Sequence, residues 1–181
     1  RSWLTSFMAG ESVFNHGQED VFLAPGPLCY SLSLYVAVYA LDRGASLYLF
    51  PRFSEQDILD AISREGKCFV YVVPTMLQAL SSARVKMDEP VTFISSGAKL
   101  QDTVRKNTLA SFPKCTIYEY YGASELSLVT YMDELSLIDY PESVGRPFPG
   151  VKLSIRNEKG DLLGPGEIGE LYVSSPFTFR Q

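Results

Sequence analysis

The amino-acid sequence predicts an α/β protein: a mostly parallel sheet flanked by helices, followed by a small antiparallel, β-barrel-like portion. The first observation is alternation, because short apolar runs and helical segments follow one another between residues 21 and 118. The second is a change after Pro141, where glycines and prolines punctuate two strand-like runs. The third is composition, since 46% hydrophobic and 13% aromatic residues indicate a globular core. We expect an α/β subdomain over residues 1–140 and a truncated β-rich subdomain over residues 141–181.

The first expected elements are a helix, a strand and a longer apolar helix. Ser2 can cap a helix over residues 2–14. A short strand over residues 21–24 ends at a Pro-Gly-Pro turn. The apolar run 28–41 is shorter than the roughly 20 residues that cross a membrane, so we interpret it as a buried helix that ends at Gly44. We therefore expect no membrane span.

The next elements alternate between strand and helix. Ser54 is placed to cap one helix, and Pro74 suits the first turn of another. The run 68–73 is apolar throughout, as in a strand covered on both faces. The expected strands are residues 46–50, 68–73, 91–95, 115–118 and 126–131, and the expected helices are residues 54–63, the segment that begins at Pro74, and residues 100–111.

The tail is expected to be antiparallel. Residues 151–156 and 168–174 are strand-like, and residues 157–161 have the composition of a hairpin turn between them. Residues 164–169 spell G-x-G-x-x-G, the pattern of a dinucleotide-binding turn. That pattern precedes a strand instead of opening a helix, so the dinucleotide interpretation fails.

Charge and cysteine content exclude several classes of function. The net charge is −5 and no Lys/Arg cluster stands out, so nucleic acid is not an expected partner. Cys29, Cys68 and Cys115 each lie in an apolar run, without metal-ligand spacing. Buried free thiols fit a reducing compartment, so we expect a cytoplasmic protein.

Some polar residues are expected to have no role in a site. His16 lies near a helix end beside polar residues, and a Ser-His-Asp triad built on it is disfavoured. The acidic pairs at residues 19–20, 88–89 and 133–134 are interpreted as solvated loop charges, because nothing in the sequence converges on them.

Two loops that follow strands carry candidate chemistry, at residues 95–100 and residues 120–125. Ligands of a parallel sheet bind beyond the carboxyl ends of its strands, so one ligand can touch both loops. Small residues before a helix can accept a nucleotide or an anion, although a tight strand-to-helix turn has the same composition.

The second loop holds a complete set of groups for a nucleotide. Tyr121 offers a flat face to a purine, and Gly122 leaves room for a phosphate. Ser124 can donate a hydrogen bond to a phosphate oxygen, and Glu125 can hold magnesium. The alternative is an ordinary glycine turn with an exposed glutamate.

The stretch Tyr121-Gly122-Ala123-Ser124-Glu125 resembles the Tyr-Gly-x-Thr-Glu motif of the adenylate-forming (AMP-binding) enzymes. These enzymes include acyl-CoA synthetases, peptide-synthetase adenylation domains and luciferases. Further stretches resemble the same superfamily in the expected order, at residues 24–32, residues 96–100, and residues 144–151 with 166–171.

The resemblance implies roles for particular residues. Ser96, Gly97 and Ala98 would line the join between the adenine and acyl pockets, and Tyr30 would take a place often held by histidine. The implied sets are the catalytic residues Ser124 and Glu125, with Glu125 also the metal ligand; the cofactor-binding residues Ser96, Gly97, Ala98, Tyr120, Tyr121 and Gly122; and the substrate-pocket residues Tyr30 and Lys99.

Some of these positions depart from the family pattern. Tyr30 in place of histidine removes a titrating group, and Ser96 and Lys99 replace glycine and proline. Ser124 in place of threonine keeps the hydroxyl group.

The resemblance also implies an activity. Members of the superfamily condense a carboxylate with ATP to an acyl-adenylate, release pyrophosphate, and in synthetases pass the acyl group to CoA or a carrier thiol. We therefore expect ATP, Mg²⁺, CoA and a carboxylic acid as cofactor and substrates. The apolar run 28–41 suits a fatty acid. Alternatives are an amino-acid or aryl-acid adenylation domain, a non-catalytic binding module of the same fold, and a generic α/β domain with accidental matches.

Several family segments are not found. The sequence shows no phosphate loop ending in Pro-Lys-Gly, no Thr-Gly-Asp, and no C-terminal domain with a catalytic lysine. We expect an interior fragment of a longer enzyme's N-terminal domain, inactive without the missing N-terminal and C-terminal parts.

Overall fold

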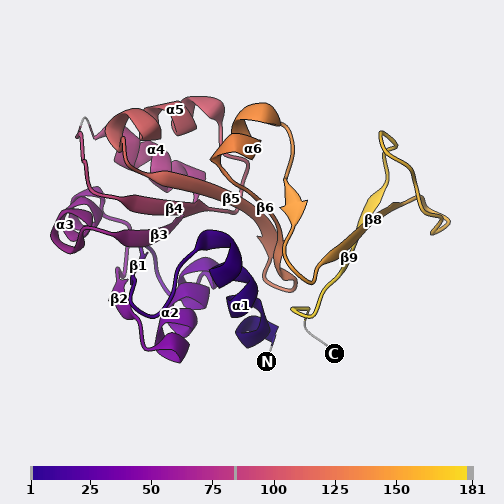
Figure 1. The fold of residues 1–181 in the computed structure, drawn as a ribbon, viewed down its shortest axis with the longest axis horizontal. Coiled ribbons are helices and arrows are strands. Elements are labelled where there is room, and N and C mark those ends of the chain that lie inside the picture. The colour runs from indigo at the N-terminus through magenta and orange to yellow at the C-terminus, as the bar shows by residue number, and fades with distance from the viewer. Residues whose placement is uncertain (1, 84, 179–181) are drawn as a thin grey trace.

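The computed structural model describes residues 2–83 and 85–178, and it shows a mainly parallel sheet between two layers of helices (Figure 1). The helices are α1 (Ser2–Phe14), α2 (Ser31–Arg43), α3 (Glu55–Glu65), α4 (Pro74–Ser82), α5 (Asp102–Ser111) and α6 (Glu134–Asp139). The strands are β1 (Val21–Ala24), β2 (Ser46–Leu49), β3 (Cys68–Val72), β4 (Val91–Ser95), β5 (Thr116–Ala123), β6 (Ser127–Met132), β7 (Arg146–Pro147), β8 (Lys152–Arg156) and β9 (Glu170–Ser174).

The larger sheet has the strand order β2-β1-β3-β4-β5-β6-β7 among the described residues. The strands from β2 to β5 in this order are parallel to one another. β6 pairs antiparallel with β5, and β7 pairs antiparallel with β6. Every residue of β3 is buried, because helices cover both faces of the sheet. The α/β class and the alternation predicted from the sequence are confirmed.

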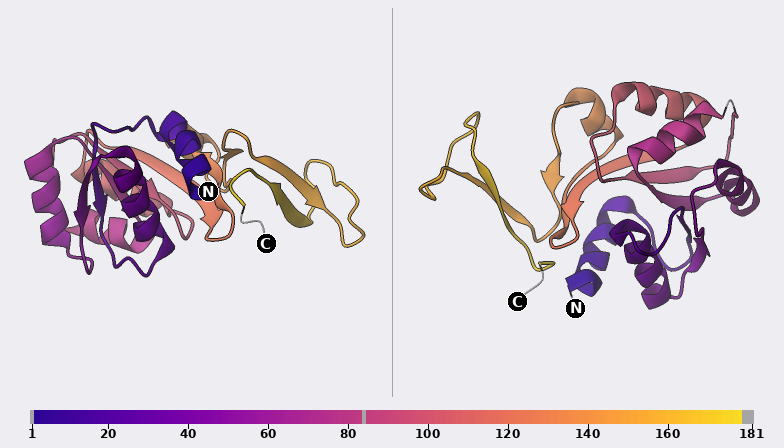
Figure 2. Two further views of the ribbon diagram at one scale, coloured as in Figure 1. Left: turned by 90° about the horizontal axis from the view of Figure 1, so that it is seen from below. Right: turned by 180° about the vertical axis from the view of Figure 1, so that it is seen from behind.

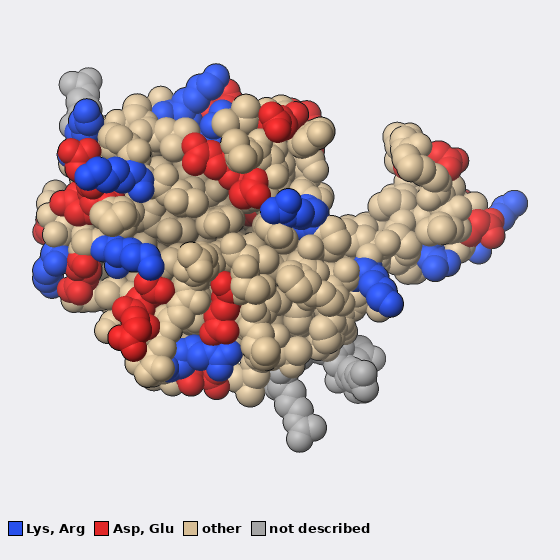
Figure 3. Space-filling model, in the orientation of Figure 1, with Lys and Arg blue, Asp and Glu red and all other residues tan. Residues whose placement is uncertain are grey.

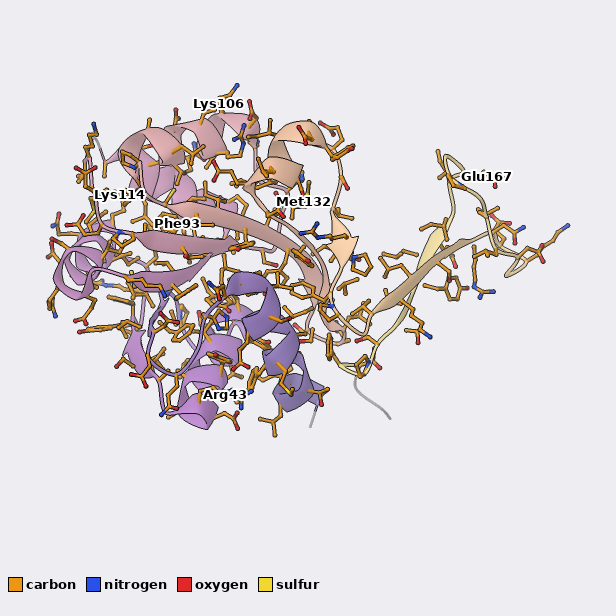
Figure 4. All side chains as sticks on the ribbon, in the orientation of Figure 1. Arg43, Phe93, Lys106, Lys114, Met132 and Glu167 are labelled. Atoms are coloured by element: carbon orange, nitrogen blue, oxygen red, sulfur yellow. The ribbon has the colours of Figure 1, made fainter. Side chains whose placement is uncertain are left out.

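Each face of the sheet has its own hydrophobic core. On one face, α1 and α2 contribute Phe7 and Tyr39 to an aromatic core with Phe22 of β1. On the other face, α3 to α6 pack against residues such as Phe93, which Figure 4 places within the sheet. Phe93 meets Phe112 edge-on, with ring centroids 5.1 Å apart. The sheet therefore separates two environments.

Several local signals act as predicted. The Ser54 side chain accepts a hydrogen bond from the Asp57 amide at 3.4 Å, and Pro74 begins α4. In the tail, β8 pairs antiparallel with β9, and this hairpin projects away from the α/β body (Figure 2). A turn forms at residues 157–161, but Leu162 then pairs with Arg156 before the chain returns along β9.

The predicted start of the helix at residues 28–41 is wrong. The chain makes a turn in which the Tyr30 amide bonds to the Pro27 carbonyl at 3.1 Å, and α2 begins only at Ser31. Cys29 lies in this turn and is exposed, so its predicted burial is also wrong. Cys68 and Cys115 are buried as predicted, and burial raises the pKa of each thiol to about 12.

The predicted strand 115–118 is too short. β5 continues to Ala123 because antiparallel β6 supplies partners, pairing Tyr120 with Tyr131 and Tyr121 with Thr130. Most of the expected loop at residues 120–125 is therefore strand. β7 follows residue 141, so the expected subdomain boundary there remains a prediction, and residues 179–181 of the second subdomain lie outside the described residues.

Asp133 is not a solvated loop charge. Its carboxylate accepts a hydrogen bond from the Ser136 amide at 2.9 Å, so it caps α6, a helix that the sequence pattern did not predict. Its other oxygen lies 2.9 Å from Nη2 of Arg146. Hydrogen bonds and this cation hold the pKa of Asp133 below its usual value.

The surface carries mixed charge. On the face shown in Figure 3, Lys and Arg side chains lie beside Asp and Glu side chains over the α/β body, without an extended basic area. Across residues 2–83 and 85–178, no helix has the length and hydrophobicity of a transmembrane span.

Candidate functional site

A cavity of about 530 Å³ lies between the sheet and the layer formed by α1 and α2. Its walls include the turn after β1, the start of the loop after β4, and the β5–β6 hairpin. These segments meet at the carboxyl ends of parallel strands, where ligands of such sheets bind. Six residues predicted for a site line this cavity: Tyr30, Ser96, Gly97, Tyr120, Gly122 and Ser124.

The lining is aromatic, aliphatic and hydroxylic. Tyr35 of α2 and Tyr71 of β3 form part of the wall, and Tyr30 stands 64% exposed. Burial raises the pKa of Tyr120 to about 12, against the opposing effect of the Ser96 hydroxyl. Such a cavity suits the uncharged part of a ligand.

Strand alternation divides the tyrosine pair of β5 between two faces. Tyr120 joins the aromatic core under α1 and α2, where its ring centroid lies 6.3 Å from that of Phe14. Successive side chains of a strand point to opposite faces, so Glu119 and Tyr121 face the other helical layer. Tyr121 is 41% exposed and does not belong to the cavity lining. The motif therefore serves two different environments.

Gly122 has a structural requirement that the sequence did not reveal. A Cβ atom at this position would lie 2.1 Å from the carbonyl oxygen of Ser127, across a bulge in the β5–β6 pair. Only glycine permits this close approach of two backbones. The close approach to Ser127 is thus a structural reason for glycine at this position. The further role inferred from the sequence, that Gly122 leaves room for a phosphate, remains a prediction.

The loop after β4 bends at Gly97, whose φ of 91° favours glycine. Ser96 is buried beside the cavity, whereas Ala98 and Lys99 are exposed and outside its lining. The ammonium group of Lys99 donates to the Ser143 carbonyl at 2.7 Å. The structure therefore does not bring Lys99 into the cavity, although the sequence predicts it for the substrate pocket.

Glu119 is a candidate that the sequence analysis missed. Its side chain is buried, and Oε1 lies 3.3 Å from Nζ of Lys99. Burial raises its pKa, while the Lys99 cation and the Leu100 amide oppose that change. Within the described residues, Glu119 Oε2 has no hydrogen-bond partner. A ligand N–H group could supply the missing donor.

The neighbouring strand carries a second atom of this kind. Ser95 of β4 is aligned with Glu119 of β5, and its hydroxyl oxygen also has no partner among the described residues. Both are buried polar atoms on adjacent strands. A signal in the sequence was available, because Glu119 is a charged residue inside an otherwise apolar and aromatic strand.

Ser124 and Glu125 lie in the exposed turn between β5 and β6. Among the residues that the structure describes, no group of three or more His, Cys, Asp or Glu side chains could hold a metal. Magnesium commonly uses one or two carboxylates and completes its shell with phosphate oxygens and water. An accessible Glu125 next to a hydroxyl group fits that mode of binding.

His16 is buried, contrary to the polar helix end that the sequence suggested. Its Nδ1 lies 3.0 Å from the Tyr39 hydroxyl, and its Nε2 lies 3.1 Å from the hydroxyl of Tyr71, which lines the cavity. Burial lowers its pKa from 6.5 to about 4, so the imidazole is neutral at pH 7. Both ring nitrogens contact phenol hydroxyl groups, which agrees with the rejection of a Ser-His-Asp triad.

Similarity to known proteins identifies the family of this chain. A sequence model of the AMP-binding enzyme family matches residues 1–181. An uncharacterized acyl-CoA ligase, YhfT of Bacillus subtilis, is 40% identical over 179 residues, which are 99% of this chain and 37% of that protein. A putative long chain fatty acid-CoA ligase, VraA of Staphylococcus epidermidis, is 34% identical over 90% of this chain and 36% of its own length. The chain belongs to the AMP-binding enzyme family.

The fold has a close counterpart among solved structures. O-succinylbenzoate CoA synthetase (MenE) from Bacillus subtilis, in complex with ATP and magnesium ion, superimposes with a TM-score of 0.90. The match covers 99% of this chain and 38% of that chain at 20% identity, so it shows the fold alone. The chain spans little more than a third of the length of the relatives described above.

Proposed function

We propose that the full-length protein is an ATP-dependent acyl-CoA synthetase. It would join a carboxylic acid to the AMP part of ATP, releasing pyrophosphate, and then transfer the acyl group to the sulfur of CoA, releasing AMP. Family membership supports the first step, and the relatives named as acyl-CoA ligases support the second.

The observation that carries the proposal is that the two faces of β5 border dissimilar environments. On one side, Tyr120 borders an uncharged cavity that suits an acyl group. On the other side, Tyr121 is accessible and Glu119 has an unpartnered oxygen. A molecule built from an acyl group and a nucleotide needs both environments at one strand end.

We assign the nucleotide to the outer face of β5. The Tyr121 ring would pack on the purine, and Glu119 Oε2 would accept a hydrogen bond from an amino group of the base. Ser96, Gly97 and Ala98 would line the join between the adenine and acyl pockets, with Gly122 on the neighbouring strand. Ser124 would donate to a phosphate oxygen, and magnesium held at Glu125 would neutralise phosphate charge.

We assign the acyl group to the cavity, with Tyr30 near its opening. No charged side chain lines the cavity within the described residues, which favours a fatty or other neutral acid. An amino acid would bring an ammonium group without a carboxylate partner there. An aryl acid also fits the aromatic walls and remains the second candidate. The buried free thiols Cys68 and Cys115 support a cytoplasmic location.

Acid-dependent pyrophosphate release by the full-length protein tests this proposal. We expect release with one class of acid and a loss of at least about 100-fold in kcat for Glu125→Ala. Glu158→Ala is the matched control, because Glu158 is exposed in the turn after β8, away from the cavity lining. A folded protein that binds ATP but releases no pyrophosphate with fatty, aryl or amino acids would instead be a binding module.

A further inference from the structure

One wall of the cavity carries a cluster of three hydroxyl groups. Tyr35 of α2 and Ser127 at the start of β6 line the cavity, and Ser6 of α1 is fully buried beside them. The Tyr35 hydroxyl lies 3.0 Å from Ser6 Oγ, and Ser127 Oγ lies 3.2 Å from the same oxygen. The family resemblance gave none of these residues a role.

The direction of each hydrogen bond follows from counting protons. A hydroxyl group has a single proton to donate. Ser6 Oγ donates its proton to the Trp3 carbonyl oxygen at 2.7 Å. Ser6 Oγ must therefore accept both remaining bonds, so the hydroxyl protons of Tyr35 and Ser127 are both directed at it. The oxygens of Tyr35 and Ser127 have only acceptor lone pairs left for a ligand.

The acceptor oxygens of Tyr35 and Ser127 favour some ligand groups over others. An oxo group has no proton to donate, so its lone pairs would face theirs and be repelled. An ammonium group could donate, but the described lining has no carboxylate to balance its charge. A hydroxyl group donates a proton and brings no net charge, so it matches the wall best.

The backbone of Ser127 gives independent support. Its φ is 59°, a left-handed conformation that is costly for a residue with a Cβ atom. Glycine would adopt this conformation without strain, yet the position carries a serine. Strained residues with side chains concentrate at functional sites, which fits a use for the Ser127 hydroxyl.

We propose that the preferred substrate is a carboxylic acid whose acyl part carries a neutral hydroxyl group, bound by the oxygens of Tyr35 and Ser127. This inference rests on the proposed function and names its substrate class. A cavity of about 530 Å³ leaves room for an acyl part of moderate length.

Matched acids test the inference on the full-length protein. Octanoate is compared with its monohydroxy isomers and their oxo counterparts, and 3-phenylpropionate with its ring-hydroxylated forms, by pyrophosphate release. We expect at least one hydroxy acid to exceed its unsubstituted parent by about tenfold or more in kcat/KM. We expect the corresponding oxo acid to fall at or below the parent.

Variants connect this preference to the two oxygens. Tyr35→Phe and Ser127→Ala each remove one acceptor, and together they should bring the ratio of kcat/KM for the hydroxy acid and its parent to about one. Tyr48→Phe is the control, because Tyr48 bonds to Glu65 away from the cavity and should leave the ratio unchanged. The comparison of acids on the unaltered protein does not depend on whether the variants fold.

The outcomes separate the two proposals. Activity on unsubstituted or oxo acids that equals or exceeds activity on every hydroxy acid would overturn the hydroxyl inference and leave the ligase proposal intact. A preference for hydroxy acids that survives in the double variant would overturn the assignment to Tyr35 and Ser127. No release with any acid would contradict the ligase proposal, and with it the inference.

Discussion

The two faces of the sheet at β5 differ in kind, although consecutive residues of this one strand supply both. The face under α1 and α2 holds an uncharged, aromatic cavity that includes Tyr120. The face toward α4 to α6 holds Glu119, its partner Lys99 and the accessible ring of Tyr121. One interior strand can therefore offer an apolar environment on one face and a polar environment on the other, as the proposed acyl-adenylate requires, because successive side chains point to opposite faces.

The largest expected effect comes from a substitution that disrupts the backbone of the β5–β6 pair, and with it the environments on both faces of β5. In Gly122→Ala, the new Cβ atom would collide with the Ser127 carbonyl, because it would lie 2.1 Å from that oxygen. We expect destabilisation by about 3 kcal/mol and loss of pyrophosphate release. Thermal unfolding measures the first effect. Gly17→Ala is the control, since no described atom other than those of its chain neighbours lies within 4 Å of its added Cβ. Equal stability of the two variants would refute the close approach.

The cavity face should be sensitive to acid through His16. Burial lowers its pKa from 6.5 to about 4, so between these values the unfolded chain binds a proton that the folded chain does not. Stability contributed by neutral His16 is therefore lost as the pH falls from about 6.5 to 4, by at most about 3 kcal/mol. Unfolding measured across this range should show a weaker pH dependence for His16→Gln. An unchanged dependence would contradict the buried, neutral imidazole.

The opposite face should respond to loss of its cation. Lys99→Met leaves buried Glu119 without its ionic partner, but the Lys99 side chain is 37% exposed, so we expect a loss of only about 1–2 kcal/mol at pH 7. Because protonated Glu119 needs no cation, the difference from the unaltered protein should shrink as the pH falls. Melting temperatures at pH 7 and pH 5 measure it. A difference that stays constant would argue against the pair.

The smallest effect on stability is expected at the start of α6, which covers the face of the sheet that holds Glu119. Asp133→Ala removes the cap of α6 and the partner of Arg146, which should cost about 1 kcal/mol. Thermal unfolding should place this variant below Asp139→Ala, because Asp139 lies at the opposite end of the same helix. Equal melting temperatures would mean that the cap contributes little.

Much of the fold could be predicted because its signals are local. The alternation, the cap at Ser54 and the proline at the start of α4 depend on residues next to one another. The extension of β5 and the helix α6 were not predicted, since β5 needs the ladder of β6, and the cap of α6 was interpreted as a solvated charge. Long-range pairing leaves no local pattern.

The candidate site was predicted in part for the same reason. The family-like motifs led to Tyr30, Ser96, Gly97 and other residues that line the cavity. Glu119 was missed although a charged residue stands out in this strand, because its burial and its lack of a partner exist only once β4 and β5 are aligned. The hydroxyl cluster of Ser6, Tyr35 and Ser127 joins residues far apart in the chain, so no spacing in the sequence indicates it.

The separation of the two faces can be tested most directly by comparing Tyr120→Leu with Tyr121→Leu in the full-length protein. Initial rates of pyrophosphate release would be measured while the acid and ATP are varied in turn. We predict that Tyr120→Leu mainly raises KM for the acid, and that Tyr121→Leu mainly raises KM for ATP, each by about tenfold. Parallel changes in both constants for the two variants would contradict the assignment of acyl group and nucleotide to opposite faces of β5.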